Sequence, residues 1–305
     1  MLFQSVGVGL MAGWNARCCT PPRPARLNRR IAVLARKEAS SVSRRDFLEV
    51  AGGSLLAATA ASAVKTTPAM AKGFPKAKAL TFDLYGTLLR VEAVPEKLGK
   101  FFSDKGITAD PRQFWSTWLS KLLVFSMYNT MIAKGFEPFF ELSKKAVRTT
   151  ANILKVNLKG DDVTVLAEFW NQLDPYADVI PGLEEFRKQG YLLAPLTNGN
   201  KTMVVKGLID RVNFKWDHLF TADMWGVNKP HPHIYQKSLE AWGFRPEEVI
   251  HIGRVQFDIF GAKGVGMRMA WINRANEPLD EYGYRSDWTV KDFLELAKIF
   301  ETEKP

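Results

Sequence analysis

Short apolar runs alternate with helical patterns along most of this chain, and this alternation constrains the fold more than any other feature. The apolar runs are "ALTFDLYG" (79–86), "YLLAPLTNGN" (191–200), "HLFTAD" (218–223), "EVIHIGR" (248–254) and "RMAWINR" (268–274). Amphipathic stretches such as "LEEFRKQG" lie between them, and this one ends in Gly190, a helix C-cap signal. Strands that alternate with helices predict a parallel sheet that is covered on both faces.

Polar residues follow the ends of three of the predicted strands. Asp83 and Thr197 come at the ends of two apolar runs, and the segment "GRVQFD" (253–258) follows a third. In parallel sheets of this kind, ligands bind at the carboxyl ends of the strands. We therefore expect Asp83, Thr197 and segment 253–258 to converge on one crevice.

Residues 91–175 interrupt the alternation, because they contain no convincing strand. Within them, "FWSTWLSKLLVFSMYNTM" (114–131) carries apolar side chains at three- and four-residue spacings, which is typical of one helix face. These side chains are Phe114, Trp115, Trp118, Leu122, Phe125 and Tyr128. We interpret the segment as a helical insertion whose aromatic stripe forms its own core, with one or two rings left to roof the crevice.

The first 71 residues have the character of a targeting leader. Residues 1–37 contain no acidic residue and six arginines, a pattern that resembles an organellar transit peptide. Arg44 and Arg45 then precede an apolar run over 50–64, which resembles a twin-arginine signal and is too short for the roughly 20 residues of a spanning helix. Tandem signals resemble the import route of a chloroplast thylakoid lumen protein. A bacterial periplasmic protein exported by the twin-arginine route is the alternative, and a plain buried or interfacial helix is also left open.

The charge and the cysteines also belong to the leader. The chain has a net charge of +10, and residues 1–71 hold ten Lys or Arg and three Asp or Glu, a net of +7. Residues 72–305 therefore carry a net charge of only +3, which gives no argument for a nucleic-acid partner. Both cysteines, Cys18 and Cys19, precede residue 72. A processed chain would therefore have no disulfide, thiolate metal site or cysteine nucleophile, and we expect no stable membrane span after processing.

Four segments together carry a family resemblance. They are "FDLYGTL", "LTNGN", "KPHPHIY" and "FDIFGAKGVGMRMAWINR", in that order. They resemble the haloacid dehalogenase (HAD) superfamily and, within it, the L-2-haloacid dehalogenase branch, over about residues 78–298. The resemblance implies an α/β fold, a Rossmann-like doubly wound parallel sheet formed by 72–90 and 176–305. It also implies that residues 91–175 form a helical cap.

The resemblance assigns roles to the first motif. Asp83 matches the nucleophile, whose carboxylate would form a covalent ester that water then hydrolyses. Thr87 is expected to hydrogen-bond within the nucleophile loop. Tyr85 stands where phosphatase members carry a second aspartate, and a phenol with a pKa of about 10 is a poor proton shuttle at neutral pH. Tyr85 therefore favours the dehalogenase branch, and we place it among the substrate-binding residues.

Further matches supply a substrate-binding set and a cation. Thr197 and Asn198 match the second motif, whose hydroxyl and amide groups would hold a substrate carboxylate. A simple strand-to-helix turn is the other interpretation of "NGN". Lys229 matches the third motif, where an ammonium group pairs with the nucleophile. Tyr235 matches a tyrosine of the dehalogenase branch and is assigned to substrate binding.

The fourth motif departs from the phosphatase pattern. Phosphatases usually show Gly-Asp followed by a second Asp, whereas this chain has Gly253, Arg254 and Asp258. We expect Lys229 and Arg254 to face Asp83 and Asp258, which would leave the site near neutral without a metal. The expected cofactor set is therefore none, with Mg²⁺ required only if the chain is a phosphatase.

Two departures from the dehalogenase branch concern turnover. That branch carries a serine and an asparagine at the positions of Gly253 and Val255, and these help to position the hydrolytic water. It also carries an arginine near the start of the cap. Here Lys121 is the candidate substitute, and Arg254 is a second candidate from the opposite side of the site.

Three function hypotheses follow. The first is a hydrolase that acts through an aspartyl ester on a small 2-substituted carboxylic acid. The second is a catalytically degenerate HAD-fold binding or assembly protein, and the third is a metal-dependent phosphatase. A small-molecule acid is the expected partner, and the sequence leaves a homodimer open.

The leader generates the first testable prediction. If tandem import signals are removed, N-terminal sequencing of the native protein should find a mature chain that begins near Lys72. Recovery of a native chain that begins before Ser43 would contradict the lumenal location.

Overall fold

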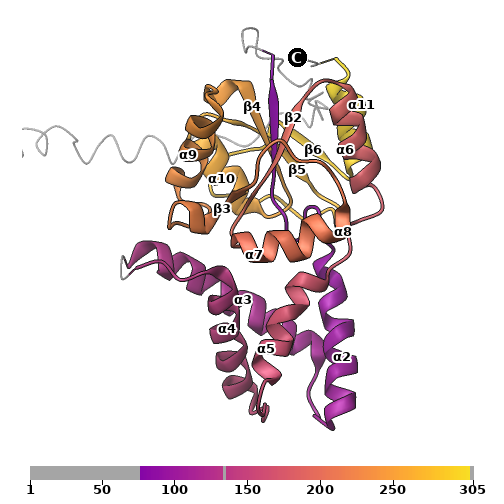
Figure 1. Cartoon of the computed structure of the whole chain (residues 1–305), viewed down its shortest axis with the longest axis vertical. Helices are drawn as coiled ribbons and strands as arrows, with labels where there is room; N and C mark the ends of the chain where they lie inside the picture. The colour runs from indigo at the N-terminus through magenta and orange to yellow at the C-terminus, as the bar shows by residue number, and fades with distance from the viewer. Residues whose placement is uncertain (1–75, 133–134, 303–305) are drawn as a thin grey trace, which may run out of the picture. The chain divides into compact units, whose positions relative to one another are not determined.

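A six-stranded parallel sheet forms the centre of the protein (Figure 1). The computed structural model describes residues 76–132 and 135–302, so the predicted leader (1–71) lies outside the described residues. The strands are β1 (Ala79–Phe82), β2 (Leu192–Thr197), β3 (Phe220–Thr221), β4 (Val249–Gly253), β5 (Arg268–Ile272) and β6 (Trp288–Val290). Their order is β3-β2-β1-β4-β5-β6, and every neighbouring pair is parallel. The α/β architecture predicted from the alternating pattern is confirmed.

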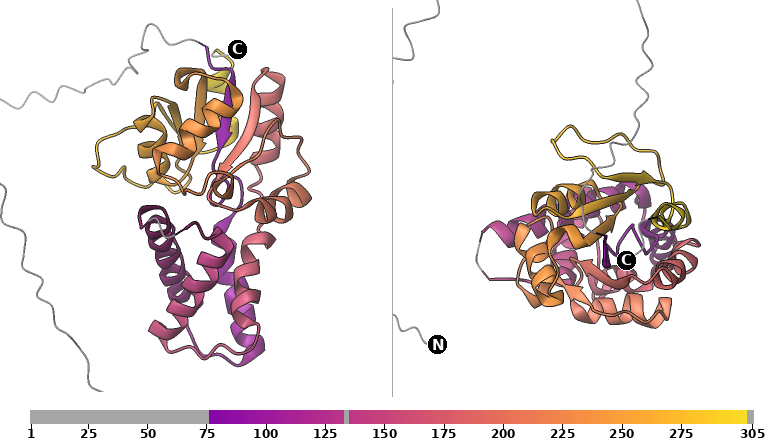
Figure 2. Two further views of the ribbon diagram at one scale, coloured as in Figure 1. Left: turned by 60° about the vertical axis from the view of Figure 1, so that its left-hand side comes forward. Right: turned by 90° about the horizontal axis from the view of Figure 1, so that it is seen from above.

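Helices cover both faces of this sheet. The helices α6 (Val179–Lys188) and α11 (Phe293–Phe300) pack on one face, and α9 (Pro232–Trp242) and α10 (Gln256–Gly264) pack on the other (Figure 2). Side chains of β1 alternate between the two cores, because successive residues of a strand point to opposite faces. Leu80 and Phe82 belong to the core under α6 and α11, whereas Ala79 belongs to the core under α9 and α10. Thr81 therefore faces the α9–α10 side.

The segment between β1 and α6 is helical, as the sequence predicted. Its helices are η1 (Val91–Ala93), α2 (Val94–Lys105), α3 (Pro111–Met131), α4 (Phe139–Leu154), α5 (Asp162–Ala167) and η2 (Glu168–Gln172). We call residues 91–175 the helical insertion; it forms the lower group of helices in Figure 1. Phe114, Trp115, Trp118 and Leu122 are buried in its core, whereas Tyr128 is exposed. The exact domain boundaries stay a prediction.

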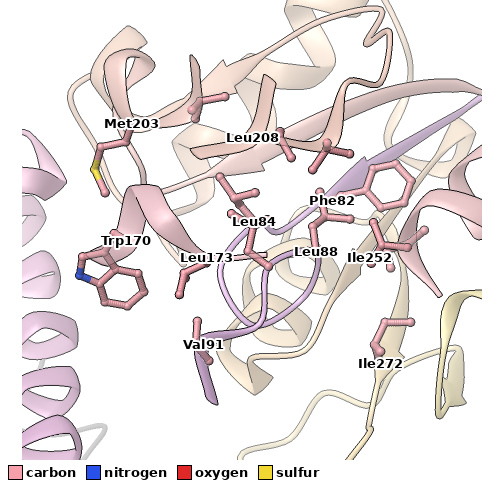
Figure 3. Close-up of a cluster of buried hydrophobic side chains, with 14 of the residues drawn as sticks. Phe82, Leu84, Leu88, Val91, Trp170, Leu173, Met203, Leu208, Ile252 and Ile272 are labelled. Atoms are coloured by element: carbon pink, nitrogen blue, oxygen red, sulfur yellow. The ribbon is translucent and has the colours of Figure 1, made fainter. Parts of the chain in front are cut away.

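One hydrophobic cluster joins the helical insertion to the sheet. Trp170 of η2 and Leu84 and Leu88 of the loop after β1 belong to the same buried cluster as Ile252 of β4 (Figure 3). Because this cluster surrounds the end of β1, the loop that carries Asp83 is packed between the two parts of the fold.

The remaining short elements complete the connections on the β3 side of the sheet and before β4. They are α7 (Lys201–Val204), the π-helical turn η3 (Val205–Ile209), α8 (Asp210–Val212), η4 (Ala222–Met224) and η5 (Pro246–Glu248). Across residues 76–132 and 135–302, none of the helices has both the length and the apolar character needed to cross a membrane. The outer part of α3 exposes Val124, Met127 and Met131, and the homodimer left open by the sequence stays a prediction.

Candidate active site

The loop after β1 holds Asp83 at the carboxyl end of the central strand. The Asp83 N–H donates to the carbonyl oxygen of Ile252 in β4 at 2.9 Å, which continues the sheet pairing by one residue. Three residues later Gly86 has φ +88°, a left-handed conformation that favours glycine and allows the chain to turn back. The Asp83 residue is only 6% exposed.

Lys229 places one ammonium group between two buried carboxylates. Its Nζ lies 2.8 Å from Oδ1 of Asp83 and 2.9 Å from Oδ1 of Asp258. Lys229 is 1% exposed and Asp258 is fully buried. Burying an ammonium group without a partner is unfavourable, so the two carboxylates and the lysine depend on one another.

Asn198 positions Lys229 through the main chain. Its Oδ1 accepts from the Lys229 N–H at 2.6 Å, and its Nδ2 donates to the Lys229 carbonyl oxygen at 3.3 Å. Neighbouring Thr197 accepts the Gly199 N–H on its Oγ1 at 3.0 Å. Both residues line the pocket described below, but their side chains also do structural work that the sequence did not predict.

Thr87 holds the second oxygen of Asp83. The Thr87 hydroxyl donates to Asp83 Oδ2 at 2.9 Å and accepts from the Arg254 N–H at 2.8 Å. Each Asp83 oxygen therefore has a donor, Lys229 on Oδ1 and Thr87 on Oδ2. The carboxylate is held in one orientation from two sides.

A polar layer lies beneath Asp258 on the α9–α10 side of the sheet. The Tyr235 hydroxyl donates to Asp258 Oδ1 at 3.1 Å, and His251 Nε2 lies 3.4 Å from the same oxygen. The other ring nitrogen of His251, Nδ1, is 2.9 Å from the Thr81 hydroxyl, its partner in the β1–β4 register. All four side chains are buried.

This layer changes the interpretation of two residues. Tyr235 was assigned to substrate binding, but it is buried behind Asp258 and does not line the pocket. The reason is that α9 packs directly on the sheet and directs the ring toward β4. His251 was missed; a histidine at the centre of a buried strand was the signal that could have identified it.

Two glycines make room for this layer. A side-chain Cβ at Gly253 would lie 2.7 Å from Asp258 Oδ2, and a Cβ at Gly261 would lie 2.5 Å from the Tyr235 hydroxyl. Both distances are shorter than ordinary contacts between a Cβ and a heavy atom. With Asp258 and Tyr235 in these positions, the serine expected at residue 253 from the dehalogenase branch has no space.

Arg254 does not face Asp83, and this part of the sequence-based prediction is wrong. Its guanidinium group lies 3.0 Å from Glu277 and 3.5 Å from Glu92. The side chain extends over Gly86, where a Cβ atom would lie 3.5 Å from the Arg254 Nη1. Lys229 is therefore the cation that faces the Asp83 and Asp258 carboxylates. The expected balance of two cations against two carboxylates does not hold.

The pKa values of this cluster follow from burial and from the shared ammonium group. Burial raises the pKa of Asp83, and Lys229 only partly opposes it. Burial alone would raise the pKa of Asp258, but Lys229 and His251 lower it below its ordinary value. Burial alone would lower the pKa of Lys229, but Asp258 and Asp83 raise it. Burial also lowers the pKa of His251, which favours its neutral form.

A pocket of about 370 Å³ opens onto Asp83. We call it the Asp83 pocket. Thr197, Asn198, Arg254 and Val255 line it from the sheet side, and Phe139 and Trp170 line it from the helical insertion. The roofing rings expected from the aromatic stripe thus come from α4 and η2, outside that stripe. Lys121 does not line the pocket, so the sequence-based candidate for a cap cation is wrong.

Tyr85 forms part of the same wall. Its ring stacks on Phe139 at 6.1 Å between centroids and meets Trp170 edge-on at 4.9 Å. Its hydroxyl is buried without a hydrogen-bond partner among the described residues. Burial, and then the charge of Asp83, raise the pKa of Tyr85 above its ordinary value, so the phenol is a donor that keeps its proton.

The shared ammonium group generates a stability prediction. Lys229→Met should lower the free energy of unfolding by about 3–5 kcal/mol, because it leaves two buried carboxylates without their cation. Urea unfolding at pH 7 measures the change. The double variant Lys229→Met/Asp258→Asn should recover part of the loss, since one buried charge is then removed.

A surface lysine provides the matched control. Lys100 pairs with Asp104 at 2.8 Å on an exposed helix face, so Lys100→Met should change the stability by no more than about 1 kcal/mol. A Lys229→Met protein as stable as the Lys100→Met protein would contradict the role of the buried ammonium group.

Comparisons with known proteins agree with this geometry. Residues 77–266 match the family model of the haloacid dehalogenase-like hydrolases. The chain is 30% identical to haloacetate dehalogenase H-2 of Moraxella sp. (strain B), over 70% of this chain and 94% of the relative. It is 26% identical to the (S)-2-haloacid dehalogenase of Pseudomonas sp. (strain YL), over 74% of this chain and 95% of the relative.

A solved structure extends the likeness to three dimensions. A crystal structure of a dehalogenase superposes with a TM-score of 0.66 at 26% identity, covering 73% of this chain and 96% of that one. The chain therefore belongs to the haloacid dehalogenase-like hydrolases, as a hydrolase of the L-2-haloacid dehalogenase branch.

Proposed function

We propose that this protein hydrolyses a 2-substituted carboxylic acid through an ester on Asp83. The observation that carries the proposal is the buried Asp83 carboxylate, held by Lys229 and Thr87 at the wall of the Asp83 pocket. The names of the similar proteins suggest a 2-haloacid as the substrate class.

The proposed reaction has two steps. An Asp83 oxygen attacks C2 of the acid, a C–O bond forms, and the C–halogen bond breaks with its electron pair leaving on the halide. Water then attacks the ester carbonyl carbon, which returns the Asp83 carboxylate and releases a 2-hydroxy acid and one proton. Lys229 and Thr87 hold the attacking carboxylate in a fixed orientation, which reduces the entropic part of the barrier.

Asp258, Tyr235 and His251 act on Asp83 indirectly in this proposal. Asp258 shares the Lys229 ammonium group with Asp83, and Tyr235 and His251 hold Asp258 from below. Their expected effect is to fix the position of Lys229. Arg254, which is paired with Glu277 and Glu92, is assigned to the wall of the pocket and its ion pairs.

The phosphatase alternative is disfavoured by the donors on Asp83. Lys229 and Thr87 already bond its two oxygens, and Tyr235 and Lys229 bond Asp258 Oδ1. A Mg²⁺ ion requires near-octahedral oxygen ligands, and Asp258 Oδ2 is the one oxygen of this pair without a hydrogen-bond partner among the described residues. Tyr85 also lacks the carboxyl group that would transfer a proton in phosphate chemistry. We therefore propose a reaction without Mg²⁺.

A degenerate binding protein is the second candidate, and Val255 is the observation that favours it. Val255 lines the pocket beside Asp83 but offers no hydrogen bond to a water molecule. In this candidate the pocket and the nucleophile are retained while turnover of the ester is slow or absent. The proposed location, a thylakoid lumen or a bacterial periplasm, rests on the leader sequence alone.

The covalent step generates a direct test. Mixing the protein with (S)-2-chloropropionate should add the mass of the acid, less chloride, to the peptide that carries Asp83. Since Val255 does not position water, hydrolysis of the ester should be slower than its formation. Loss of this assistance lowers the rate of hydrolysis by about two to four powers of ten. The adduct should then be visible by mass spectrometry within one turnover, with or without a chelator of divalent cations.

Two variants separate the steps. Asp83→Asn should give no adduct, because an amide is a poor nucleophile, and Val255→Asn should shorten the lifetime of the adduct. If haloacids and phosphate esters all leave Asp83 unmodified and release no product, the degenerate binding protein becomes the better description.

The raised pKa of Asp83 generates a pH prediction. Burial raises this pKa above its ordinary value of 3.8, and only the ionised carboxylate attacks. The rate of adduct formation should therefore fall as the pH is lowered, with a midpoint above 3.8. Because the pKa of Lys229 is raised above 10.5, no loss should occur between pH 7 and pH 10. Single-turnover rates across this range measure both limits, and a loss centred near pH 8 would contradict the assigned roles.

A further inference from the structure

We propose that the substituent on C2 of the substrate is bulky, apolar and uncharged. This inference rests on the proposed function for the reacting end of the substrate and concerns the rest of the molecule. It comes from the walls, the charges and the size of the Asp83 pocket.

The walls that the helical insertion contributes are apolar. Leu119 and Leu123 of α3, Phe139 of α4 and Trp170 of η2 line the pocket on this side. From the sheet side Phe260 of α10 lines it as well. A ligand that contacts these side chains replaces water at apolar surface, which favours hydrocarbon over polar groups.

The charged residues of the pocket disfavour a second anionic group. Arg254 is the cation in the described lining, and its guanidinium group is committed to Glu277 and Glu92. Glu277 and Asp280 also line the pocket, so acidic side chains border its polar part. A substituent with its own carboxylate would meet like charges there, whereas an alkyl or aryl group would not.

The size of the pocket exceeds that of a short haloacid. Its volume is about 370 Å³. This volume lies within the range of about 300–1,000 Å³ that is typical of pockets for drug-sized ligands, whereas 2-bromopropionate has only about six non-hydrogen atoms. The difference leaves room for several carbon atoms beyond C3, next to Leu119, Leu123 and Trp170.

The test compares acids that differ only in the substituent. Halide release is measured for (S)-2-bromopropionate, (S)-2-bromohexanoate and (S)-2-bromoglutarate. Burying one methylene group fully raises binding or kcat/KM about fourfold. Three added methylenes should therefore raise kcat/KM for bromohexanoate about tenfold or more over bromopropionate. Bromoglutarate should release bromide more slowly than bromohexanoate.

A binding measurement separates this inference from the proposed function. Calorimetry with hexanoate and propionate, which have no leaving group, should give tighter binding of hexanoate. If bromopropionate releases bromide as fast as bromohexanoate or faster, the inference is overturned and the proposed function stands. If no bromide is released but hexanoate binds more tightly than propionate, the proposed function falls and the inference about the pocket stands. No turnover together with equal binding would overturn both.

Variants of α3 localise the effect. Leu123→Phe narrows the pocket. It should reduce the ratio of kcat/KM for bromohexanoate over bromopropionate, or the ratio of binding constants for hexanoate over propionate, about fivefold or more. Val124→Phe, at the next residue and on the exposed side of α3, is the matched control and should leave the ratio unchanged. Leu119→Phe provides a second narrowing variant if Leu123→Phe does not fold. An unchanged ratio in a folded narrowing variant would overturn the inference.

Discussion

The site depends on one buried ammonium group that two carboxylates share. Lys229 lies within 2.9 Å of both Asp83 and Asp258, and none of the three side chains is appreciably exposed. A buried charge needs close partners, so each of the three groups determines where the other two can be. Asn198 fixes the lysine main chain and Thr87 fixes the second oxygen of Asp83. The Asp83 carboxylate, the proposed nucleophile, is thereby held in one orientation before any substrate binds.

The fold and the main site residues could be predicted because their signals are local. Apolar runs that end in Asp83 or Thr197 predict strand ends, and parallel strands bring such ends to one edge of the sheet. The partner of Arg254 could not be predicted in the same way. Its path depends on the absent Cβ of Gly86 and on Glu277, which lies in a loop after β5. Counting charges along the sequence does not reveal which of them meet.

The layer beneath Asp258 shows a second limit of local signals. His251 meets Thr81 because β1 and β4 pair in one register, and Tyr235 reaches Asp258 because Gly261 lets α9 and α10 approach. Each of these contacts needs two elements that are distant in sequence. From the sequence alone, Gly253 is only a position without a functional side chain and Gly261 is only part of a motif. The structure requires glycine at both positions because neighbouring side chains pack too closely for a Cβ.

Fixing the nucleophile and completing a turnover place different demands on this pocket. Orientation of Asp83 depends on Lys229 and Thr87, which lie behind the pocket wall, and on Asn198 in the wall, which holds the Lys229 main chain. In the proposed reaction, hydrolysis of the ester requires a positioned water, and the pocket wall includes the apolar side chains of Val255, Leu119 and Trp170. An apolar wall excludes water while it favours a hydrophobic substituent. The same residues that would hold a bulky apolar acid would therefore slow the hydrolysis of its ester.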